Sequence, residues 1–377
     1  MNLWLEKQQH LIDFTLASLA RRKTKNIGLL IAYTLLVFVL ASLTLFSNAL
    51  RTEAQYVLAG SPEVILQRMV AGRHDLIPPG YLDKIGRIRG VQKTQGRLWG
   101  YYYDAVLNAN YTFMARPASE IADGQIMVGE TLARERGLAQ QNTISFRSYA
   151  GELFTFEVAA VLSPDAELLS ADLVLLSEND FRRFFAYPDE HYTDIALSVA
   201  NPLEVRNIAA KLTATLPDSR PILREEVQRT YQSIFDWREG ILLTVLAGAI
   251  LAFVILSWEK ASGLSAEEKR EIGILKALGW DTGDVIRMKM WEGLLISLTA
   301  FGGGFLAAYV HVFHFGAKLF EPVLKGWSVL YPKFTLLPAV DGLQVATLFF
   351  FTVIPYTAAV LVPIWRAAIT DPDTVMR

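Results

Sequence analysis

Four apolar runs interrupt a mostly polar sequence, and their lengths predict transmembrane helices. The first run, 27–48, begins with twenty residues that carry no formal charge, enough for a helix to cross about 30 Å of hydrocarbon. The others cover 239–258, 293–313 and 343–365. We expect the first run to be an uncleaved anchor, because it is longer than the apolar part of a signal peptide and no small-residue cleavage site follows it.

Basic residues border the cytoplasmic ends of these runs and predict their orientation. They are Arg21, Arg22, Lys23 and Lys25 before the first run, Lys260, Lys269, Arg270, Lys276, Arg287 and Lys289 between the second and third, and Arg366 and Arg377 after the fourth. Because loops rich in Lys and Arg stay in the cytoplasm, we expect both termini and the loop 259–292 there. The segments 49–238 and 314–342 then lie outside, and 366–377 is a cytoplasmic tail.

The N-terminal segment 1–26 is polar and basic, yet it carries apolar residues at helical spacing. These residues are Trp4, Leu5, Leu11, Ile12, Phe14 and Leu16. The pattern predicts an amphipathic helix that lies at the cytoplasmic surface of the membrane and contacts lipid.

The long segment 49–238 alternates strand and helix patterns, which is typical of an α+β domain. Strands are predicted at 63–68, 91–98, 101–107, 111–115, 125–128, 143–147, 153–162, 172–176, 192–199 and 220–224. Helices are predicted at 78–89, 129–136, 177–185 and 203–216. The order predicts two lobes: a discontinuous lobe of residues 60–117 and 190–228, and an inserted β-rich lobe of residues 118–189. We also expect a hairpin about Trp99-Gly100.

Three features of the spans predict how they pack and move. From Glu225 only Gly240 and Gly248 interrupt the helical pattern until Gly263, so a continuous helix is expected to run as a stalk from the domain through the second span. Gly302, Gly303 and Gly304 form a small-residue surface for close helix packing in the third span, and a hinge is the alternative. Pro355 is expected to kink the fourth span.

The loop between the second and third spans contains a short amphipathic pattern at 267–279. Ile272, Leu275 and Leu278, with Ile274, lie at helical spacing and are expected to form one apolar face. The opposite face carries Glu267, Glu268, Lys269, Arg270, Glu271 and Lys276. Gly279 closes the run, as expected of a left-handed helix cap. Such a helix can lie on lipid, dock on a partner, or only turn the chain.

Composition and motifs exclude several kinds of chemistry. The chain has 377 residues, 52% of them hydrophobic, and a formal net charge of −2, so no basic field favours nucleic acid. It has no cysteine, which excludes disulfides and zinc–thiolate sites. No phosphate-binding loop, serine elbow or metal-ligand cluster is recognisable. We therefore expect no enzyme activity and no cofactor in this chain.

Two local patterns leave alternatives open. His311 and His314 lie at i and i+3 and are expected to share a helix face; either they are interfacial histidines or they serve a metal or proton role. The aromatic residues of 99–103, Trp99 with three tyrosines from Tyr101 to Tyr103, either pack a core and a lobe interface or grip an apolar client.

The sequence around the predicted loop helix resembles a known family signature. Arg270-Glu271-Ile272-Gly273 followed by Lys276-Ala277-Leu278-Gly279 is similar to the FtsX-like permease family, membrane subunits of ABC transporters that include MacB and the lipoprotein-release permeases. One span, a large outer domain and three further spans is the family's order. The end of the chain, from Pro363 through Asp371-Pro372 to Met376-Arg377, is also similar, with Met376 where leucine is usual.

The resemblance implies a function in the bacterial inner membrane. It implies that 267–279 is a coupling helix that seats in a groove of a cytoplasmic ABC ATPase dimer, which binds ATP and Mg²⁺. In this interpretation Ile272, Leu275 and Leu278 fill the groove, Gly273 and Gly279 belong to the motif, and Glu268, Arg270, Glu271 and Lys276 set the register. A second copy or a paralogous permease completes the complex, and the outer domain moves against a client in the periplasm or outer leaflet.

The client is not identified by the sequence. Lipoprotein release and efflux through a periplasmic adaptor are both compatible with a MacB-like outer domain. A non-transporting protein of the FtsX kind that regulates cell-wall hydrolases is the alternative function, and a membrane receptor without an ATPase is a third.

Overall fold

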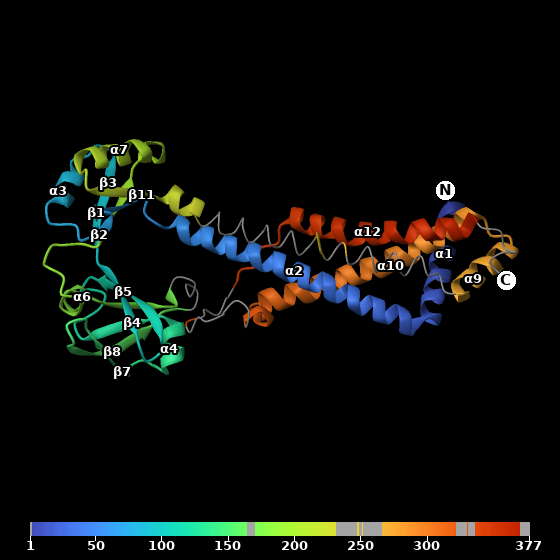
Figure 1. The fold of residues 1–377 in the computed structure, drawn as a ribbon, viewed down its shortest axis with the longest axis horizontal. Helices are drawn as coiled ribbons and strands as arrows, with labels where there is room; N and C mark the ends of the chain where they lie inside the picture. The colour runs from blue at the N-terminus through green and yellow to red at the C-terminus, as the bar shows by residue number, and fades with distance from the viewer. Residues whose placement is uncertain are drawn as a thin grey trace. The chain divides into compact units, whose positions relative to one another are not determined.

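The computed structural model describes residues 2–163, 170–230, 247–248, 251, 266–321, 330 and 336–369. The chain forms two compact units (Figure 1). One comprises Met1–Arg51, Phe235–Lys318 and Leu337–Arg377, and the other comprises Thr52–Ile234 and Leu319–Leu336. Nearly all of the predicted second span, most of the predicted stalk and the C-terminal motif from residue 370 lie outside the described residues.

The first unit is helical throughout its described part. Its elements are α1 (Asn2–Arg21), α2 (Lys23–Ala59), α9 (Ala266–Ala277), α10 (Thr282–Tyr309), the π-helical turn η3 (Val310–His314), the 3₁₀ turn η4 (Lys318–Phe320) and α12 (Gly342–Ile369). α2 continues beyond the unit, and η4 lies at its boundary. Two stretches of the described chain are long and apolar enough to cross a membrane, Asn26–Glu53 and Thr282–His314. α12 coincides with the predicted fourth span, and its part Gly342–Ala358 is apolar.

α2, α10 and α12 pack together around a small apolar core (Figure 1). Tyr33 and Val37 of α2 meet Ile296 and Ala300 of α10 and Tyr356 of α12. The Tyr33 hydroxyl donates a hydrogen bond to the backbone carbonyl oxygen of Thr352 in α12. α10 begins at Thr282, eleven residues before the predicted third span, because Asp281 in extended conformation precedes it and acid in the first turn favours a helix start.

The second unit is an α+β domain of eleven strands and short helices in its described part. The strands are β1 (Val64–Val70), β2 (Arg73–Asp75), β3 (Val91–Arg97), β4 (Trp99–Asp104), β5 (Ala109–Arg116), β6 (Gln125–Val128), β7 (Thr143–Arg147), β8 (Leu153–Val161), β9 (Leu173–Ser177), β10 (Asp194–Val199) and β11 (Ser219–Leu223). The helices are α3 (Tyr81–Gly86), α4 (Glu130–Arg136), α6 (Glu178–Phe185), η2 (Pro202–Glu204) and α7 (Val205–Thr215). Every strand predicted from the alternating pattern is present, and β6 and β7 match their predicted bounds.

The first sheet has the strand order β11-β1-β10-β3, with β2 paired to β1, and all its pairings are antiparallel. Along the chain its units are β1-α3-β3 and β10-α7-β11, the split βαβ arrangement of ferredoxin-like folds. Ile85 of α3 and Ile208 and Leu212 of α7 are buried against the sheet. The predicted helix over 78–89 is shorter than expected and covers Tyr81–Gly86, since Gly80 in left-handed conformation precedes it.

The second sheet is inserted between β3 and β10 and has the order β4-β5-β9-β6-β8-β7. It is curled, because its first and last strands approach each other through side chains. The Arg147 amide donates to the Tyr102 hydroxyl at 3.3 Å, and the ring centroids of Tyr102 and Phe146 are 5.4 Å apart. Aromatic residues fill the enclosed core, among them Phe113 and Phe184, whose rings stack at 5.2 Å.

The structure corrects two predictions about this domain. The hairpin expected about Trp99-Gly100 is wrong, because β3 pairs with β10 while β4 pairs with β5. The inserted lobe therefore begins at Trp99, not at residue 118, and β4 and β5 belong to it. Both strands carry the alternating pattern of a half-buried strand, so the pattern placed them correctly but could not assign them to a sheet.

Candidate coupling site

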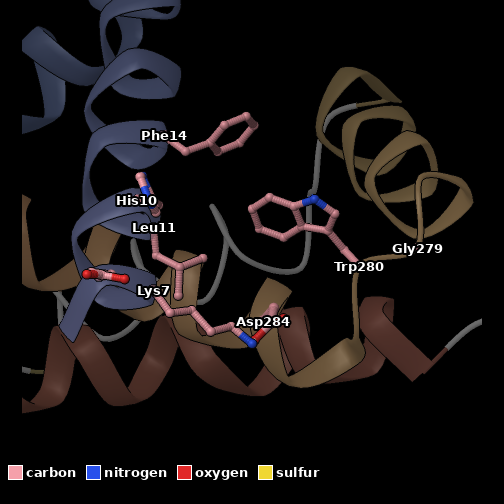
Figure 2. Close-up of a pocket in the computed structure, with 8 residues that line it drawn as sticks. Lys7, His10, Leu11, Phe14, Gly279, Trp280 and Asp284 are labelled. Atoms are coloured by element: carbon pink, nitrogen blue, oxygen red, sulfur yellow. The ribbon is translucent and has the colours of Figure 1, made fainter. Parts of the chain in front are cut away.

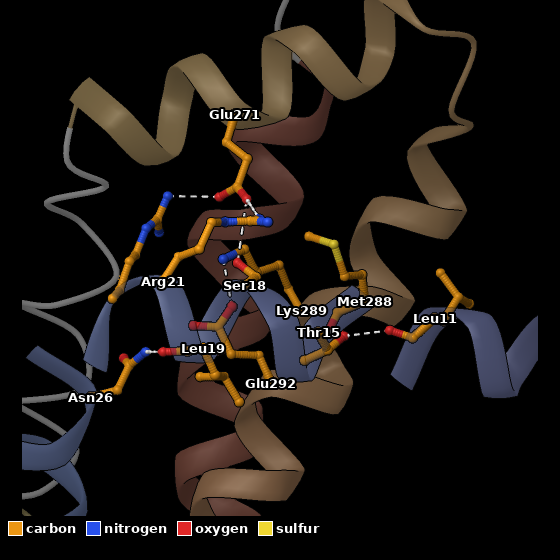
Figure 3. Close-up of polar contacts among 11 residues, drawn as sticks. Leu11, Thr15, Ser18, Leu19, Arg21, Asn26, Glu271, Met288, Lys289 and Glu292 are labelled. Carbon is orange, nitrogen blue, oxygen red and sulfur yellow. Dashed lines mark hydrogen bonds and ion pairs between the residues drawn. The ribbon is translucent and has the colours of Figure 1, made fainter. Parts of the chain in front are cut away.

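The predicted loop helix is present as α9 and lies against α1 and the start of α10 (Figure 3). Ile272 is 1% exposed and packs on Val285 of α10. Leu275 is 5% exposed and packs with Leu11 of α1 and Met288 of α10. One apolar pair of α9 therefore anchors the helix to its own chain.

A second apolar pair, Ile274 of α9 and Leu278 directly after this helix, points outward. Ile274 is 46% exposed and Leu278 is 73% exposed. The single apolar face expected from the sequence is therefore wrong: Leu278 does not share the surroundings of Ile272 and Leu275. Ile272 and Leu275 are covered by α1 and α10, so Leu278 is the one exposed residue among the three predicted to fill a partner's groove, and Ile274 is exposed as well.

The predicted left-handed cap at Gly279 is confirmed, since its φ angle is 91°. The Gly279 amide donates to the carbonyl of Lys276 at 3.0 Å, and the Trp280 amide donates to the carbonyl of Leu275 at 3.1 Å. This pair of hydrogen bonds is a Schellman motif, which commonly brings an apolar contact with it. Here Trp280 packs against Leu275 and Leu11, and this apolar contact stabilises the turn.

Glu271 is held by residues of α1 and of the junction between α1 and α2 (Figure 3). Its Oε1 accepts hydrogen bonds from Arg21 Nη2 at 3.1 Å and Ser18 Oγ at 3.3 Å. Its Oε2 accepts one from Arg22 Nη2 at 2.6 Å. The sequence singled out Glu271 as a residue facing the ATPase, but its carboxylate is engaged within the chain.

α1 is attached to α10 by a second set of polar contacts. Lys7 Nζ lies 2.9 Å from Asp284 Oδ1, and Trp291 Nε1 donates to Gln8 Oε1 at 2.9 Å. Thr15 Oγ1 lies 3.4 Å from the Met288 carbonyl oxygen. α1 was predicted as a surface helix on lipid; the structure shows that one of its faces is a protein-packing face.

A groove of about 570 Å³ opens between α1 and the turn that joins α9 to α10 (Figure 2). Leu11, Phe14 and Trp280 supply its apolar lining, and the Phe14 and Trp280 ring centroids are 5.4 Å apart. The remaining lining residues are Glu6, Lys7, His10, Gly279 and Asp284. The groove adjoins Gly279, next to the exposed Leu278.

The other predicted coupling residues are distributed around α9. Arg270 is exposed, Gly273 is buried and Lys276 is half-buried. The side chain of Glu268 lies outside the described part of the structure. Of the predicted coupling residues whose side chains are described, Arg270, Leu278 and Gly279 are exposed, and the neighbouring Ile274 is exposed as well.

A buried ion pair at the start of α10 was missed by the sequence analysis. Lys289 Nζ lies 2.5 Å from Glu292 Oε2, and the two side chains are 4% and 16% exposed. The residues are at i and i+3, a spacing that is also common on solvated helix faces. The burial of the pair could not be deduced from that spacing.

The glycine surface of α10 packs closely against α2, the predicted first span, as expected from the alternative of close helix packing. A Cβ atom at Gly304 would lie 2.7 Å from the Thr34 carbonyl oxygen, and one at Gly303 would lie 3.7 Å from Thr34 Cγ2. Gly302 faces open space. Close packing on α2 therefore accounts for Gly304 and leaves Gly302 without a packing role in the described residues.

The two histidines near the end of α10 do not share a face, contrary to the prediction. His311 is 6% exposed and its Nδ1 lies 3.2 Å from Ser42 Oγ of α2, whereas His314 is exposed. The π-helical turn Val310–His314 separates them, because i and i+3 do not align when hydrogen bonds run from i to i+5. No group of metal-ligating side chains occurs among the described residues.

The aromatic cluster of β4 divides between core and surface. Tyr102 packs in the core of the curled sheet, while Tyr101 and Tyr103 are 62% and 51% exposed. Trp99 joins the two sheets: its Nε1 donates to Asp194 Oδ2 at 2.9 Å, and its ring stacks on His74 at 5.9 Å. Trp99 and Tyr102 thus pack within the domain, and Tyr101 and Tyr103 are the surface residues of the cluster.

Comparison with known proteins finds similarity to solved structures. No family profile and no curated protein matches the sequence. Among solved structures, the chain is similar to the extracellular domain of a "noncanonic" ABC-type transporter, YknZ, from Gram-positive bacteria. The identity is 11% and the TM-score 0.29, and the match covers 42% of this chain and 98% of that one.

Proposed function

We propose that this chain is the membrane subunit of an ABC-type complex, and that α9 is the element on which a separate cytoplasmic ATPase docks. The observation that carries the proposal is the two-sided packing of α9. Ile272 and Leu275 fix the helix to α1 and α10, while Ile274 and Leu278 present an apolar surface to the outside. A docking element needs this combination, because a rigid helix binds with a smaller loss of conformational entropy.

The proposal agrees with what the sequence contains and omits. The motif residues 270–279 fall on α9 and its Schellman turn, and the full sequence has no phosphate-binding loop. ATP and Mg²⁺ therefore belong to the partner, and this chain contributes binding and movement, not hydrolysis. Two copies of the chain, or this chain and a paralogue, face an ATPase dimer in this scheme.

The orientation of the chain in the membrane is part of the proposal. α1, α9 and the first turns of α10 lie on the cytoplasmic side of the bacterial inner membrane, together with both termini. The α+β domain lies outside and acts on a client in the periplasm or outer leaflet, by lipoprotein release or efflux. The exposed Tyr101 and Tyr103 are the candidate contact surface for that client.

The test is purification of the tagged chain from native membranes in mild detergent, with mass-spectrometric identification of what accompanies it. We expect a P-loop ATPase with the unaltered chain and none with Leu278→Asp. Leu203→Asp is the matched control, because Leu203 is 89% exposed on the α+β domain. An ATPase that is retained by Leu278→Asp, or is absent from all samples, contradicts the proposal.

A further inference from the structure

Glu271 ties the α9 helix to the start of α2. α1 ends at Arg21 and α2 begins at Lys23, so the two arginines that bind the Glu271 carboxylate occupy the junction between these helices. The Glu271 and Arg22 side chains are 19% and 17% exposed, and Arg21 is 59% exposed. The pair with Arg22 is therefore the shielded one, and the pair with Arg21 is open to solvent.

The contacts of α9 differ in how well they fix its position. Ile272 and Leu275 supply burial, which favours contact but has little directional preference. The carboxylate of Glu271 supplies charge-assisted hydrogen bonds, which are short and directional. The hydrogen bond between Arg22 and Glu271, at 2.6 Å, is therefore the contact of α9 most sensitive to a small displacement.

We propose that Glu271 is a positioning residue through which movement of α9 passes to α2. α2 is one helix of 37 residues from Lys23 to Ala59, about 55 Å long at 1.5 Å per residue. A pull on Glu271 acts on Arg22 and so on the first turn of this helix. The inference rests on the proposed function, since the docked ATPase is what moves α9. It assigns to α2 the mechanical role that the sequence analysis gave to the helix after Glu225.

The first test measures whether Glu271 holds α9 in place, and it needs no ATPase. The natural sequence has no cysteine, so a single Leu275→Cys residue reports on the buried face of α9 through its rate of maleimide labelling in native membranes. We expect Glu271→Gln and Arg22→Gln to raise that rate about tenfold, equivalent to about 1.4 kcal/mol. The charge exchange Glu271→Arg with Arg22→Glu should restore slow labelling.

Two controls separate a local release from general unfolding. A Leu278→Cys reporter, exposed in the intact chain, should be labelled at the same rate with or without Glu271→Gln. Asp13→Asn removes a carboxylate from an exposed position on α1 and should leave Leu275→Cys labelling slow. Unchanged labelling in Glu271→Gln, or a charge exchange that fails to restore slow labelling, overturns the proposal.

The second test asks whether the link transmits movement. Tyr56 of α2 is 69% exposed, so Tyr56→Cys can report on the far part of α2. We expect ATP to change the labelling rate of Tyr56→Cys in the complex with the ATPase. Glu271→Gln should abolish this change, although the ATPase should still co-purify because Leu278 is intact. An intact ATP response in Glu271→Gln overturns the transmission role. Failure to capture any ATPase instead overturns the proposed function, and leaves the labelling of Leu275→Cys as an independent result.

Discussion

Gly304 of α10 lies directly against the backbone of Thr34 in α2, where an added Cβ atom would be 2.7 Å from the Thr34 carbonyl oxygen. The same atom would be 2.7 Å from Val37 Cβ. Backbone and a β-branched side chain cannot both move aside, so the approach of the two helices requires glycine at this position.

Gly304→Leu is therefore expected to separate α10 from α2. Overpacking of a filled core commonly costs about 1–3 kcal/mol, and here part of the clash is with backbone. The measurement is the midpoint temperature for loss of the monodisperse peak of the detergent-solubilised chain. Gly302→Leu is the matched control, because a Cβ there meets nothing within 4 Å. Equal destabilisation by the two variants would contradict the packing role of Gly304.

The buried pair Lys289–Glu292 predicts an asymmetry between single and double substitutions. Glu292→Gln leaves the Lys289 ammonium buried without its partner, which should cost about 3–5 kcal/mol, whereas Lys289→Met combined with Glu292→Leu should be close to neutral. Thermal midpoints of the three proteins provide the measurement. If the double variant is as unstable as Glu292→Gln, the two charges do more than neutralise each other, and the prediction is contradicted.

The hydrogen bond from Trp99 to Asp194 predicts a local effect at the crossing between the two sheets. Trp99→Phe keeps the ring but removes the donor, so about 1 kcal/mol of stability should be lost. Hydrogen exchange should accelerate in peptides that contain residues 97–100 and 192–195. Tyr101→Phe, at an exposed neighbour on the same strand, should leave exchange unchanged; a comparable acceleration there would remove the special role of Trp99.

Acid should loosen the curled sheet through Asp104. Burial opposes ionisation of this carboxyl, but hydrogen bonds from Tyr111 at 2.5 Å and the Val106 amide at 2.9 Å, with the Arg136 charge, hold its pKa below the usual value. Because the pKa of Asp104 is lower in the folded state than in the unfolded state, where it is near 3.9, the ionised carboxylate stabilises the fold above that pH. This stability is lost as the pH falls through the pKa of the folded state.

Asp104→Asn is expected to destabilise the domain near neutral pH by about 3 kcal/mol, because it breaks a buried ion pair. It should also flatten the acid dependence of hydrogen exchange in β4 and β5 below about pH 4. Hydrogen bonds with Arg68 and Tyr81 lower the pKa of Asp218, which lies directly before β11 of the first sheet. The acid response of Asp218 should not change in Asp104→Asn. Parallel pH profiles for variant and wild type would contradict the assignment to Asp104.

Local sequence patterns predicted most of the individual strands and helices, but they did not predict how distant strands pair. Alternation located β6 and β7 to the residue, because each strand of a half-buried sheet shows its own period. The passage from one sheet to the other at Leu98–Trp99 was not predictable, since it depends on β3 pairing with β10 about a hundred residues later. A tight hairpin and a crossing between sheets look alike in a short window of sequence.

The candidate site shows the same division. Helical spacing identified α9 and its glycine cap, yet α9 is apolar on two sides, and the spacing alone could not say whether Ile272 or Ile274 faces inward. Ile272 faces inward because Val285 of α10 covers it, and Leu275 is covered by Met288 of α10 and by Leu11 of α1, which lies far away in the sequence. The engagement of Glu271 by Arg21 and Arg22, about 250 residues earlier, has no local signal.

The central claim, that α9 receives an ATPase on its outer face, is tested most directly by site-specific photocrosslinking in cells. A photoreactive amino acid is placed in turn at Ile274, Leu278 and the inward-facing Leu275, and the crosslinked products are identified by mass spectrometry. We predict products with a P-loop ATPase from Ile274 and Leu278, and products within this chain from Leu275. The absence of any ATPase product from the two outward positions, or an ATPase product from Leu275 alone, would contradict the account.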